Sequence, residues 1–519
     1  MRTTRGAWAL AGLLAGGAGL ATSYVTANAL SIRESPVVAV AEDIIRLTPG
    51  SLAERAIEVL GHKDKPVLVA GILLFLVLVF AGAGVLARRA SWPPTLVFLA
   101  VALLGGLAVL LPKGSANATD ALPVAVGFVT MLVVLSLLVS PLRSSEAAEP
   151  PEPQGAPPVP TYGDDPSRRG FLVGAGVTAG TIGLLAVVGR WVGAGRREVE
   201  RLRSLLRLTG VTQPEVPPGA LVGVDDVTAW MTPADDFYLI DTTIAKPVID
   251  PTEWSLRIHG MVDRELVLSF DELNEYDKTE AWVTLNCVSN YVGGNLIGNA
   301  WWSGVRVATL LAQAGVQDGA DAVLQTSDDG WTCVTPLEAL TDDRDAMLAV
   351  AMNGKPLPIE HGFPVRTLVP GLYGYVSATK WVVDLEVTRF ADAQGYWTDK
   401  GWSAMGPVKM SSRIDVPGSG DSVDAGEVVL AGVAWAQHTG IAGVEVAVDG
   451  GSWQAGEIAD PGTDDTWVQW RAVVDVEPGD HVVRVRATDK AGVVQTGVER
   501  EPAPDGSTGW HGIDFSATA

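Results

Sequence analysis

Cysteine is almost absent from this chain: Cys287 and Cys333 are the only two in 519 residues. They allow at most one disulfide bond, which an oxidising compartment would permit. Cys287 follows the apolar residues 281–285 and precedes a loop rich in asparagine and glycine, "VSNYVGGN". Such a cysteine can be a small buried hydrophobe, a disulfide partner of Cys333, or a soft thiolate ligand for a metal. The pliant backbone after it would let a bulky cofactor approach closely, which keeps the metal-ligand hypothesis open.

Basic residues are scarce in the second part of the chain. Residues 201–519 hold 21 Lys and Arg against 46 Asp and Glu, so nearly all of the net charge of −23 lies there. An acidic surface of this kind keeps a domain soluble. It argues against nucleic-acid binding, which needs basic patches.

Long hydrophobic runs are abundant in the first 200 residues. A bilayer core needs a helix of about 20 apolar residues. The run "PVLVAGILLFLVLVFAGAGVLA" has 14 Val, Leu, Ile and Phe and no charge, which favours insertion by about 4 to 8 kcal/mol. We predict four transmembrane helices within residues 1–142, and a fifth followed by a juxtamembrane helix within 171–208. Their apolar parts lie at about 7–30, 66–87, 95–111, 122–140 and 171–189.

Histidine is missing from all five runs; the only histidine before residue 259 is His62, in a loop. A membrane-embedded b-type haem held by two imidazoles is therefore not expected. We predict that the helices serve as an anchor, or as a docking surface for a partner subunit.

The orientation follows from the charges of the short loops. These charges fall on one side if the N-terminus is cytoplasmic, and they come from Arg2, Arg5, Arg88, Arg89 and Arg143. The fifth span then leads outward, so we expect a multi-pass protein of the cell membrane with residues 195–519 outside the cytoplasm.

A Pro-rich linker, residues 143–170, precedes the fifth span. Its stretch "EPPEPQGAPPVP" cannot form a packed core, and it ends in "SRRGFL" with the pair Arg168 and Arg169. This motif resembles the twin-arginine export signal, whose pathway carries proteins already folded around a cofactor. An ordinary anchor with positive flanks is the alternative.

The remaining chain divides into two regions that differ in their pattern of apolar and polar residues. Residues 209–404 alternate short strand-like and helical segments, which is typical of an α+β domain. Residues 405–519 alternate apolar and polar residues between regularly spaced turns, which predicts an immunoglobulin-like β-sandwich. The expected fold is therefore multi-domain.

Three basic side chains could hold an anionic cofactor in the α+β domain. His361 and Arg366 are five residues apart in "HGFPVR", and Lys380 follows shortly after. Arginine binds phosphate in a bidentate manner. A histidine and an arginine near a proline are as often structural, so these residues are not specific by themselves.

In this order and spacing, the motifs of residues 230–515 resemble the sulfite oxidase family of molybdenum enzymes. The matching segments are "TPADDFY", "TLNC", "GNAWWSGV", "DDGW", "NGKPLPIEHGFPVRTLVPGLYG", "KWV", "SRIDVP", "GVAWA", "GVEVAVDGGSWQ", "RATDKAGVVQ" and "GWHGI". The resemblance implies an oxidoreductase with a molybdopterin cofactor whose molybdenum is bound by a pyranopterin dithiolene and by Cys287. It implies that the C-terminal sandwich is the family's dimerisation domain, so a homodimer is expected. By motif position, the residues that line the pterin and its phosphate would be Phe237, Tyr238, Asp328, His361, Arg366 and Lys380.

The chain departs from the family pattern where a doubly charged oxyanion would bind. Arginines expected after the Phe-Tyr pair and after the cysteine are replaced by "LID" (239–241) and "YVG" (291–293), and His438 stands where a third basic residue is expected. The family's active-site tyrosine is here Trp331, which can stack and donate one hydrogen bond but cannot relay a proton. We therefore expect Trp331 beside the site, and a small neutral or zwitterionic substrate rather than sulfite. Cys333 is expected to fill a core.

Two alternatives stay open. A true sulfite oxidase could use Arg264, Arg306 or Lys409 in place of the missing arginines, and a non-catalytic membrane-tethered binding module could keep the fold without the metal. No haem-binding or flavin segment is visible, so an enzyme of this kind needs a separate electron-transfer partner, either a haem protein or the quinone pool.

Overall fold

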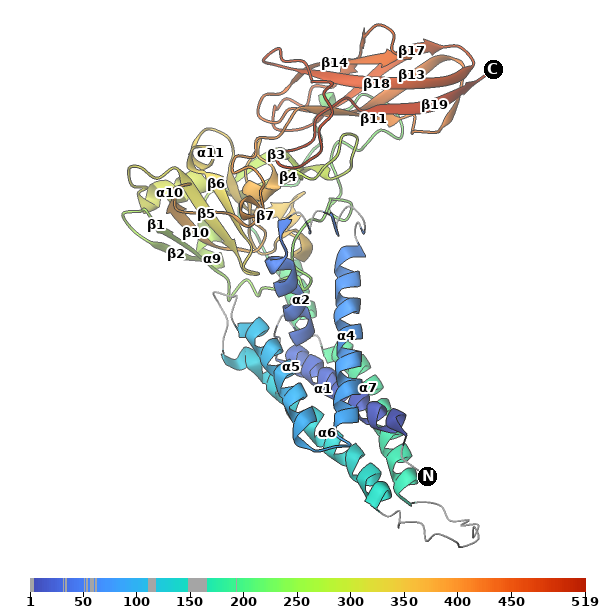
Figure 1. Cartoon of the computed structure of the whole chain (residues 1–519). Helices are drawn as coiled ribbons and strands as arrows, with labels where there is room; N and C mark the ends of the chain where they lie inside the picture. Colours follow the sequence, from blue (N-terminus) through green and yellow to red (C-terminus); the bar gives the residue numbers. More distant parts are fainter. Residues whose placement is uncertain are drawn as a thin grey trace. The chain divides into compact units, whose positions relative to one another are not determined.

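The computed structural model describes residues 4–30, 32, 35–50, 52, 55–56, 60, 63–110, 118–147, 166–192 and 194–519 (Figure 1). The chain forms two compact units, one of residues 1–200 with the short segment 242–248, the other of residues 201–241 and 249–519. The Pro-rich stretch 149–160 and His62 lie outside the described residues.

The first unit is helical. Its helices are α1 (Arg5–Ala29), α2 (Pro36–Leu47), α4 (Asp64–Leu86), α5 (Trp92–Leu110), the 3-10 helix η2 (Ala118–Ala121), α6 (Leu122–Ala147) and α7 (Pro166–Val192), and α8 (Ala194–Leu205) continues into the second unit.

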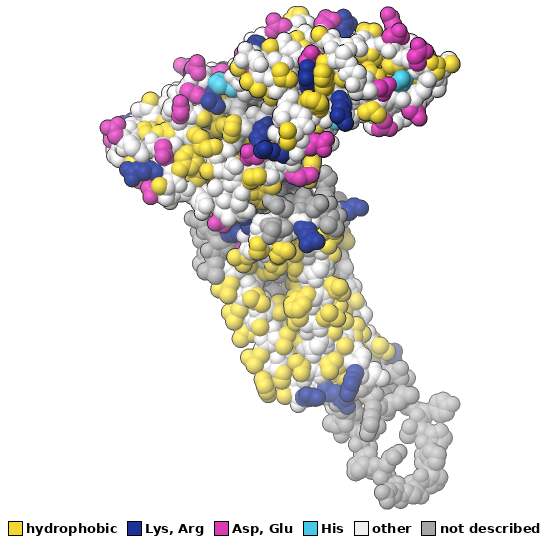
Figure 2. Space-filling view, turned by 45° about the horizontal axis from the view of Figure 1, so that its top comes forward, with side chains coloured by type: hydrophobic (Ala, Val, Ile, Leu, Met, Phe, Trp, Pro, Cys, Tyr) yellow, Lys and Arg dark blue, Asp and Glu magenta, His cyan; other side chains and the backbone are white. Residues whose placement is uncertain are grey.

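Four helices of the described chain are long and apolar enough to cross a membrane: Arg5–Ala29, Asp64–Leu86, Trp92–Leu110 and Thr119–Ser144. They coincide with the first four predicted runs. The fifth predicted run is also helical, but its apolar stretch in α7, Arg169–Leu185, is shorter. Figure 2 shows hydrophobic side chains over the outer surface of these helices.

Glycines allow the helices of this unit to approach one another closely. Gly12 of α1 and Gly84 of α4 face each other, and a Cβ atom on either would overlap the backbone of the other. Gly19 of α1 meets Gly127 of α6 in the same manner. Small residues at such crossings are typical of helix packing in membranes.

A buried glutamate joins the segment 242–248 to this unit. The Glu42 carboxylate of α2 accepts hydrogen bonds from Thr243 Oγ1 at 2.8 Å, from the Ile244 N–H at 2.7 Å and from the Ala245 N–H at 3.1 Å. Lys65 Nζ donates to the Thr243 carbonyl at 2.8 Å. These four bonds fix the chain directly after Asp241.

The α+β part of the second unit contains two sheets. One has the strand order β2-β1-β10-β5-β6, and the other has the order β3-β4-β7-β8 with β9 paired to β7. The strands are β1 (Ser255–Gly260), β2 (Leu266–Ser269), β3 (Thr279–Asn286), β4 (Ile297–Arg306), β5 (Ala322–Ser327), β6 (Thr332–Pro336), β7 (Met347–Met352), β8 (Lys355–Pro356), β9 (Arg366–Leu368) and β10 (Val382–Thr388).

Short helices precede, connect or follow these strands: η3 (Pro218–Ala220), α9 (Phe270–Glu275), α10 (Val307–Ala314), α11 (Leu337–Thr341), η4 (Ile359–His361), η5 (Gly374–Val376) and α12 (Tyr396–Asp399). A capping box between Ser269 and Glu272 begins α9, and Gly315 ends α10 in the left-handed conformation. The mixed α+β architecture predicted for this region is confirmed.

The C-terminal region consists of two sheets with the orders β11-β13-β17-β16 and β12-β19-β18-β14-β15. Residues from both sheets form one hydrophobic core, including Leu430 and Trp470 from the first and Val446 and Val485 from the second. This confirms two layers of sheet, whereas the immunoglobulin-like assignment stays a prediction. The strands are β11 (Ser411–Val416), β12 (Ser422–Asp424), β13 (Gly426–Trp435), β14 (Ile441–Val448), β15 (Gln454–Ala455), β16 (Glu457–Ile458), β17 (Val468–Val476), β18 (Gly479–Asp489) and β19 (Gly512–Thr518).

Tryptophans join the two regions of the second unit. Trp230 and Trp467 exchange hydrogen bonds, since each indole N–H donates to the backbone carbonyl of the other at 3.1 and 2.9 Å. Trp282 of β3 packs on Trp230 with 4.6 Å between ring centroids. The sandwich is therefore fixed against the β3–β4 sheet.

Candidate functional site

Cys287 is the first residue after β3, where the β3–β4 hairpin opens into a loop. β3 and β4 pair from Thr279–Gly304 to Asn286–Ile297, and the Cys287 N–H donates to the Leu296 carbonyl at 2.9 Å. Asn290 Oδ1 accepts the Leu296 N–H at 2.9 Å and stabilises the loop. The sequence-based prediction of a cysteine at a strand end is confirmed.

The two cysteines do not form a disulfide. Both are free, and Cys287 is partly exposed whereas Cys333 is buried. Cys333 belongs to β6, and its Sγ lies 3.3 Å from Thr379 Oγ1. The disulfide hypothesis is therefore wrong in this structure, and the expected core position of Cys333 is confirmed.

The Cys287 thiol lies in low-polarity surroundings. Burial raises the pKa of Cys287, and hydrogen bonds from Ser289 lower it in part. A thiol of this kind stays protonated until a metal displaces its proton. The raised pKa therefore disfavours a freely ionised nucleophile at this position.

Aromatic rings line the neighbourhood of the predicted cofactor residues. Phe237 stacks on Tyr238 with 5.2 Å between the ring centroids. It also packs in a T-shaped geometry against His361, at 5.6 Å between centroids, and against Trp302, at 5.8 Å. Gly298 makes this possible, because a Cβ atom there would lie 2.7 Å from the Phe237 ring.

Arg366 is a buried cation in β9. Its guanidinium lies over the Trp302 ring, 5.2 Å from the centroid, and donates to the His361 carbonyl at 3.3 Å. No carboxylate of the described residues forms an ion pair with Arg366. Burial lowers the pKa of Arg366 to about 10, so the side chain stays charged at neutral pH. A buried charge without a counter-charge is costly, so Arg366 is a residue that could hold an anionic group.

His361 is neutral at physiological pH. Burial lowers its pKa to about 4, and the charges of Arg366 and Lys380 lower it further, against the hydrogen bond to Ala234. Its Nε2–H donates to the Ala234 carbonyl at 2.9 Å. The ring is thereby fixed against Phe237.

Lys380 is held close to the same residues. Its Nζ forms an ion pair with Asp241 at 3.0 Å and donates to the Glu360 carbonyl at 3.2 Å. The Asp328 N–H donates to the Trp381 carbonyl at 2.8 Å, next along the chain. Lys380 thus lies close to His361, whereas the contact of Asp328 does not place it beside the aromatic rings.

Electrostatic coupling connects Cys287 with these residues. Burial raises the pKa of Tyr238 far above its ordinary value, the charge of Cys287 raises it further, and the charge of Arg366 lowers it. Both groups are therefore within electrostatic range of the Tyr238 hydroxyl. The predicted residues Phe237, Tyr238, His361, Arg366 and Lys380 form one neighbourhood.

Trp331 belongs to the turn of the β5–β6 hairpin. Its N–H donates to Asp329 Oδ1 at 3.0 Å and its carbonyl accepts the Ser327 N–H at 2.9 Å. These contacts are confined to the hairpin and do not include Cys287. A catalytic role of Trp331 stays a prediction.

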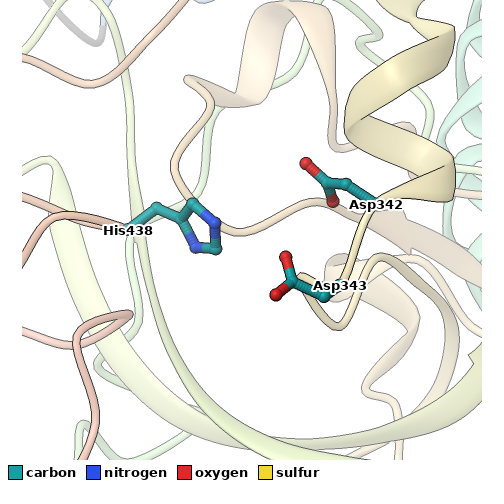
Figure 3. A group of neighbouring side chains, drawn as sticks. All are labelled: Asp342, Asp343 and His438. Atoms are coloured by element: carbon teal, nitrogen blue, oxygen red, sulfur yellow. The ribbon is translucent and has the colours of Figure 1, made fainter.

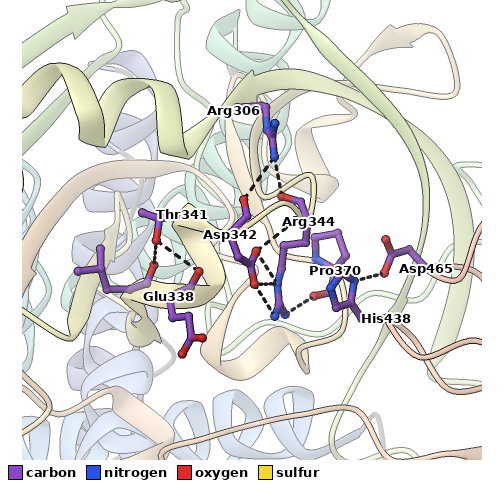
Figure 4. A network of polar contacts seen from close by, with 9 residues as sticks. Arg306, Glu338, Thr341, Asp342, Arg344, Pro370, His438 and Asp465 are labelled. Atoms are coloured by element: carbon purple, nitrogen blue, oxygen red, sulfur yellow. Dashed lines mark hydrogen bonds and ion pairs between the residues drawn. The ribbon is translucent and has the colours of Figure 1, made fainter. Parts of the chain in front are cut away.

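The structure reveals a second polar cluster that the sequence did not indicate (Figure 3). The side chains of Asp342, Asp343 and His438 bring potential ligand atoms within 4.8 Å of one another. Arg344, however, already pairs with Asp342 at 2.8 Å, and His438 Nδ1 lies 3.1 Å from Asp465 Oδ1 (Figure 4). We interpret the cluster as an ion-pair network, because the guanidinium neutralises the carboxylate that a metal would need.

Arg413 is another residue near the loop that the sequence did not indicate. This buried side chain pairs with Asp415 at 2.6 Å and donates to the Gly294 carbonyl at 2.7 Å and to Thr228 Oγ1 at 2.8 Å. It therefore supports the loop after Cys287 from the sandwich side. An arginine two residues before an aspartate in a strand is a common pattern, so the sequence does not predict that Arg413 supports this loop.

Comparison with known proteins gives a consistent result. Residues 243–397 match a family model described as an oxidoreductase molybdopterin binding domain. The uncharacterized oxidoreductase YuiH of Bacillus subtilis (strain 168) is 34% identical over 165 residues, which are 32% of this chain and 80% of YuiH.

Two further proteins are similar over a longer part of the chain. The mitochondrial sulfite oxidase of Rattus norvegicus is 29% identical over 289 residues, which are 47% of this chain and 51% of that enzyme. The crystal structure of the sulfane dehydrogenase SoxCD from Paracoccus pantotrophus aligns with a TM-score of 0.47 and 22% identity, covering 57% of this chain and 82% of that chain. The chain thus spans about half the length of the rat relative.

Proposed function

Because the chain belongs to the sulfite oxidase family of molybdopterin-dependent oxidoreductases, we propose that it is a membrane-anchored enzyme that transfers an oxygen atom to or from a small neutral or zwitterionic substrate. Sulfoxides and N-oxides are the substrate class that we favour. The observation that carries the proposal is that one domain contains both a free cysteine, Cys287, and a buried guanidinium, Arg366, that forms no ion pair with a carboxylate of the described residues.

The residues present fit the cofactor of this family. When bound, Mo-molybdopterin supplies two-electron oxygen-atom chemistry. Cys287 would ligate the metal, and Arg366 would bind the phosphate of the pterin, which gives the buried cation its missing counter-charge. Phe237, Tyr238 and His361 would pack on the pterin, and Lys380 and Asp328 would lie at its edge.

The charges near the Cys287 loop support a substrate without a double negative charge. Arg413 is paired with Asp415 at 2.6 Å, and Lys409 is paired with Asp505 at 2.8 Å. Burial lowers the pKa of His511, which packs on Gly293 of the loop. These side chains therefore offer little net positive charge to an oxyanion such as sulfite.

The alternative of a true sulfite oxidase needs cations that are free to bind sulfite. Arg264 donates to the Gln313 carbonyl at 3.0 Å, Arg306 donates to the Asp342 and Arg344 carbonyls at 3.4 and 3.3 Å, and Lys409 pairs with Asp505. Each candidate replacement is thus engaged elsewhere. Arg366, which has no carboxylate partner in the part of the chain that the structure describes, likewise weighs against a binding module without cofactor.

The location of the enzyme is part of the proposal. The four long apolar helices, with α7 as a fifth span, would anchor it in the cell membrane, with residues 195–519 on the outer face and the twin-arginine-like motif directing export. Electrons would pass to or from a separate haem protein or quinone-linked partner. The C-terminal sheets would provide a homodimer surface.

The test uses the full-length chain, purified in detergent from a molybdenum-replete host. We expect molybdenum by elemental analysis, and turnover of dimethyl sulfoxide or trimethylamine N-oxide with a reduced viologen as electron donor. A protein without molybdenum contradicts the enzymatic proposal. Fast turnover of sulfite with ferricyanide, and none of the other substrates, contradicts the substrate class.

A further inference from the structure

A short segment of the C-terminal region, residues 505–507, connects the loop after Cys287 with a buried tyrosine, Tyr373. Ser507 Oγ donates to the Asn290 carbonyl at 2.6 Å, and Asn290 itself donates its N–H to the Cys287 carbonyl at 3.1 Å. Gly506 lies directly against the Tyr373 hydroxyl, because a Cβ atom on Gly506 would be 2.5 Å from Tyr373 Oη. Gly506 has a φ of +103°, which also requires glycine.

The Tyr373 hydroxyl has an unused hydrogen. The residue is 3% exposed, and its oxygen accepts the Lys409 N–H at 3.2 Å. No acceptor among the described residues takes the Tyr373 O–H. A buried hydroxyl normally satisfies its donor as well as its acceptor, so the free donor indicates a ligand.

The backbone around Tyr373 is held rigidly. The Tyr373 N–H donates to the Gly406 carbonyl at 2.7 Å, and its own carbonyl accepts Ser377 Oγ at 2.9 Å. Arg344, oriented by Asp342, donates to the Pro370 carbonyl at 3.0 Å (Figure 4). The ion-pair network thus fixes the turn that presents the tyrosine.

The hydroxyl is a neutral hydrogen-bond donor. Burial raises the pKa of Tyr373 to about 12, and the Lys409 N–H lowers it in part. The phenol therefore keeps its proton at neutral pH.

We propose that Tyr373 is a catalytic residue whose hydroxyl donates a hydrogen bond to the oxygen atom of the substrate bound beside Cys287. This inference rests on the proposed function. The hydrogen bond would hold a sulfoxide or N-oxide oxygen in place and stabilise the negative charge that gathers on it as the S–O or N–O bond weakens. This hydrogen bond would recognise a neutral oxygen acceptor, and the site would need no cation to do so.

The test is Tyr373→Phe in the full-length holoenzyme, which keeps the buried ring and removes only the hydroxyl. We expect kcat/KM for dimethyl sulfoxide and trimethylamine N-oxide to fall about 10-fold to 100-fold, as for the loss of one hydrogen bond to a charged group. Dimethyl sulfone, an oxygen acceptor of similar shape, should bind about 5-fold more weakly as a competitive ligand. Molybdenum content and the midpoint of thermal unfolding should stay close to the wild type.

Tyr375→Phe is the matched control. Tyr375 is also buried, but its hydroxyl donates to the Ser403 carbonyl at 2.7 Å, so its hydrogen already has an acceptor. We expect this variant to keep the wild-type kcat/KM and sulfone binding.

Two results would overturn the inference in distinguishable ways. If the wild type is active and Tyr373→Phe retains its kcat/KM and sulfone binding within twofold, the role of Tyr373 is wrong and the proposed function stands. If the wild type contains no molybdenum, or reduces neither probe, the proposed function fails and the role of Tyr373 fails with it.

Discussion

Arg366 lies over the face of Trp302, 5.2 Å from the ring centroid, and among the described residues it has no carboxylate partner. The indole face supports the charge only in part. The structure therefore contains a cation in a position where the folded chain alone does not neutralise it.

Replacing Arg366 should separate cofactor binding from folding. Arg366→Met removes a costly buried charge, so we expect the cofactor-free protein to unfold at the same temperature as the wild type or a higher one. The same variant should lose most of its pterin, measured by fluorescence after oxidative release.

Arg366→Lys is the control for charge alone. It keeps the positive charge but loses the fork that binds phosphate in a bidentate manner, so we expect pterin content between those of wild type and Arg366→Met. Full pterin retention in Arg366→Met would contradict the phosphate-binding role.

The pH dependence of stability should report the buried His361. Its pKa is lowered from 6.5 to about 4, so between these values the unfolded chain binds the proton and the folded chain does not. The contribution of His361 to the free energy of unfolding is therefore fully present above pH 6.5. It decreases as the pH falls from 6.5 to about 4, by about 3 kcal/mol at most. The midpoint of thermal unfolding should fall more steeply with decreasing pH in the wild type than in His361→Gln. Parallel curves would contradict this.

Gly298 should be essential for the position of Phe237. In Gly298→Ala the new methyl group meets the Phe237 ring at 2.7 Å, so we expect a loss of about 1–3 kcal/mol in stability. Because Phe237 packs against His361 and Trp302, pterin content should fall as well.

Gly443→Ala provides a control for a strand glycine. A Cβ atom on Gly443 of β14 meets no atom within 4 Å and the residue has no positive φ, so stability and pterin content should stay unchanged. Equal behaviour of the two variants would contradict the close packing of Phe237 as the cause.

The sequence was sufficient for features that depend on local pattern. The apolar run before Cys287 and the soft loop after it predicted a cysteine at a strand end, and the motif positions of Phe237, His361 and Arg366 predicted residues that the structure brings together. Four apolar runs predicted four long helices. The helices and the strand end follow from periodicity within the sequence, whereas the grouped residues follow from the resemblance to the sulfite oxidase family.

Other features depend on contacts between distant segments. Tyr373 gains its place from Gly506 and Lys409, and the Asp342–His438 cluster joins residues almost 100 positions apart. No local pattern signals such contacts. The expected place of Trp331 beside the thiol was inferred from motif position alone, and the contacts of its hairpin do not test it.

The sulfur–metal bond at Cys287 is tested most directly by X-ray absorption at the molybdenum edge, on the wild type and on Cys287→Ser. Cys333→Ser serves as control, because Cys333 is buried next to Thr379 and should leave the spectrum unchanged. We expect Cys287→Ser to lose one sulfur from the metal coordination, or to lose the metal altogether. An unchanged number of sulfur ligands at full molybdenum content would contradict the account.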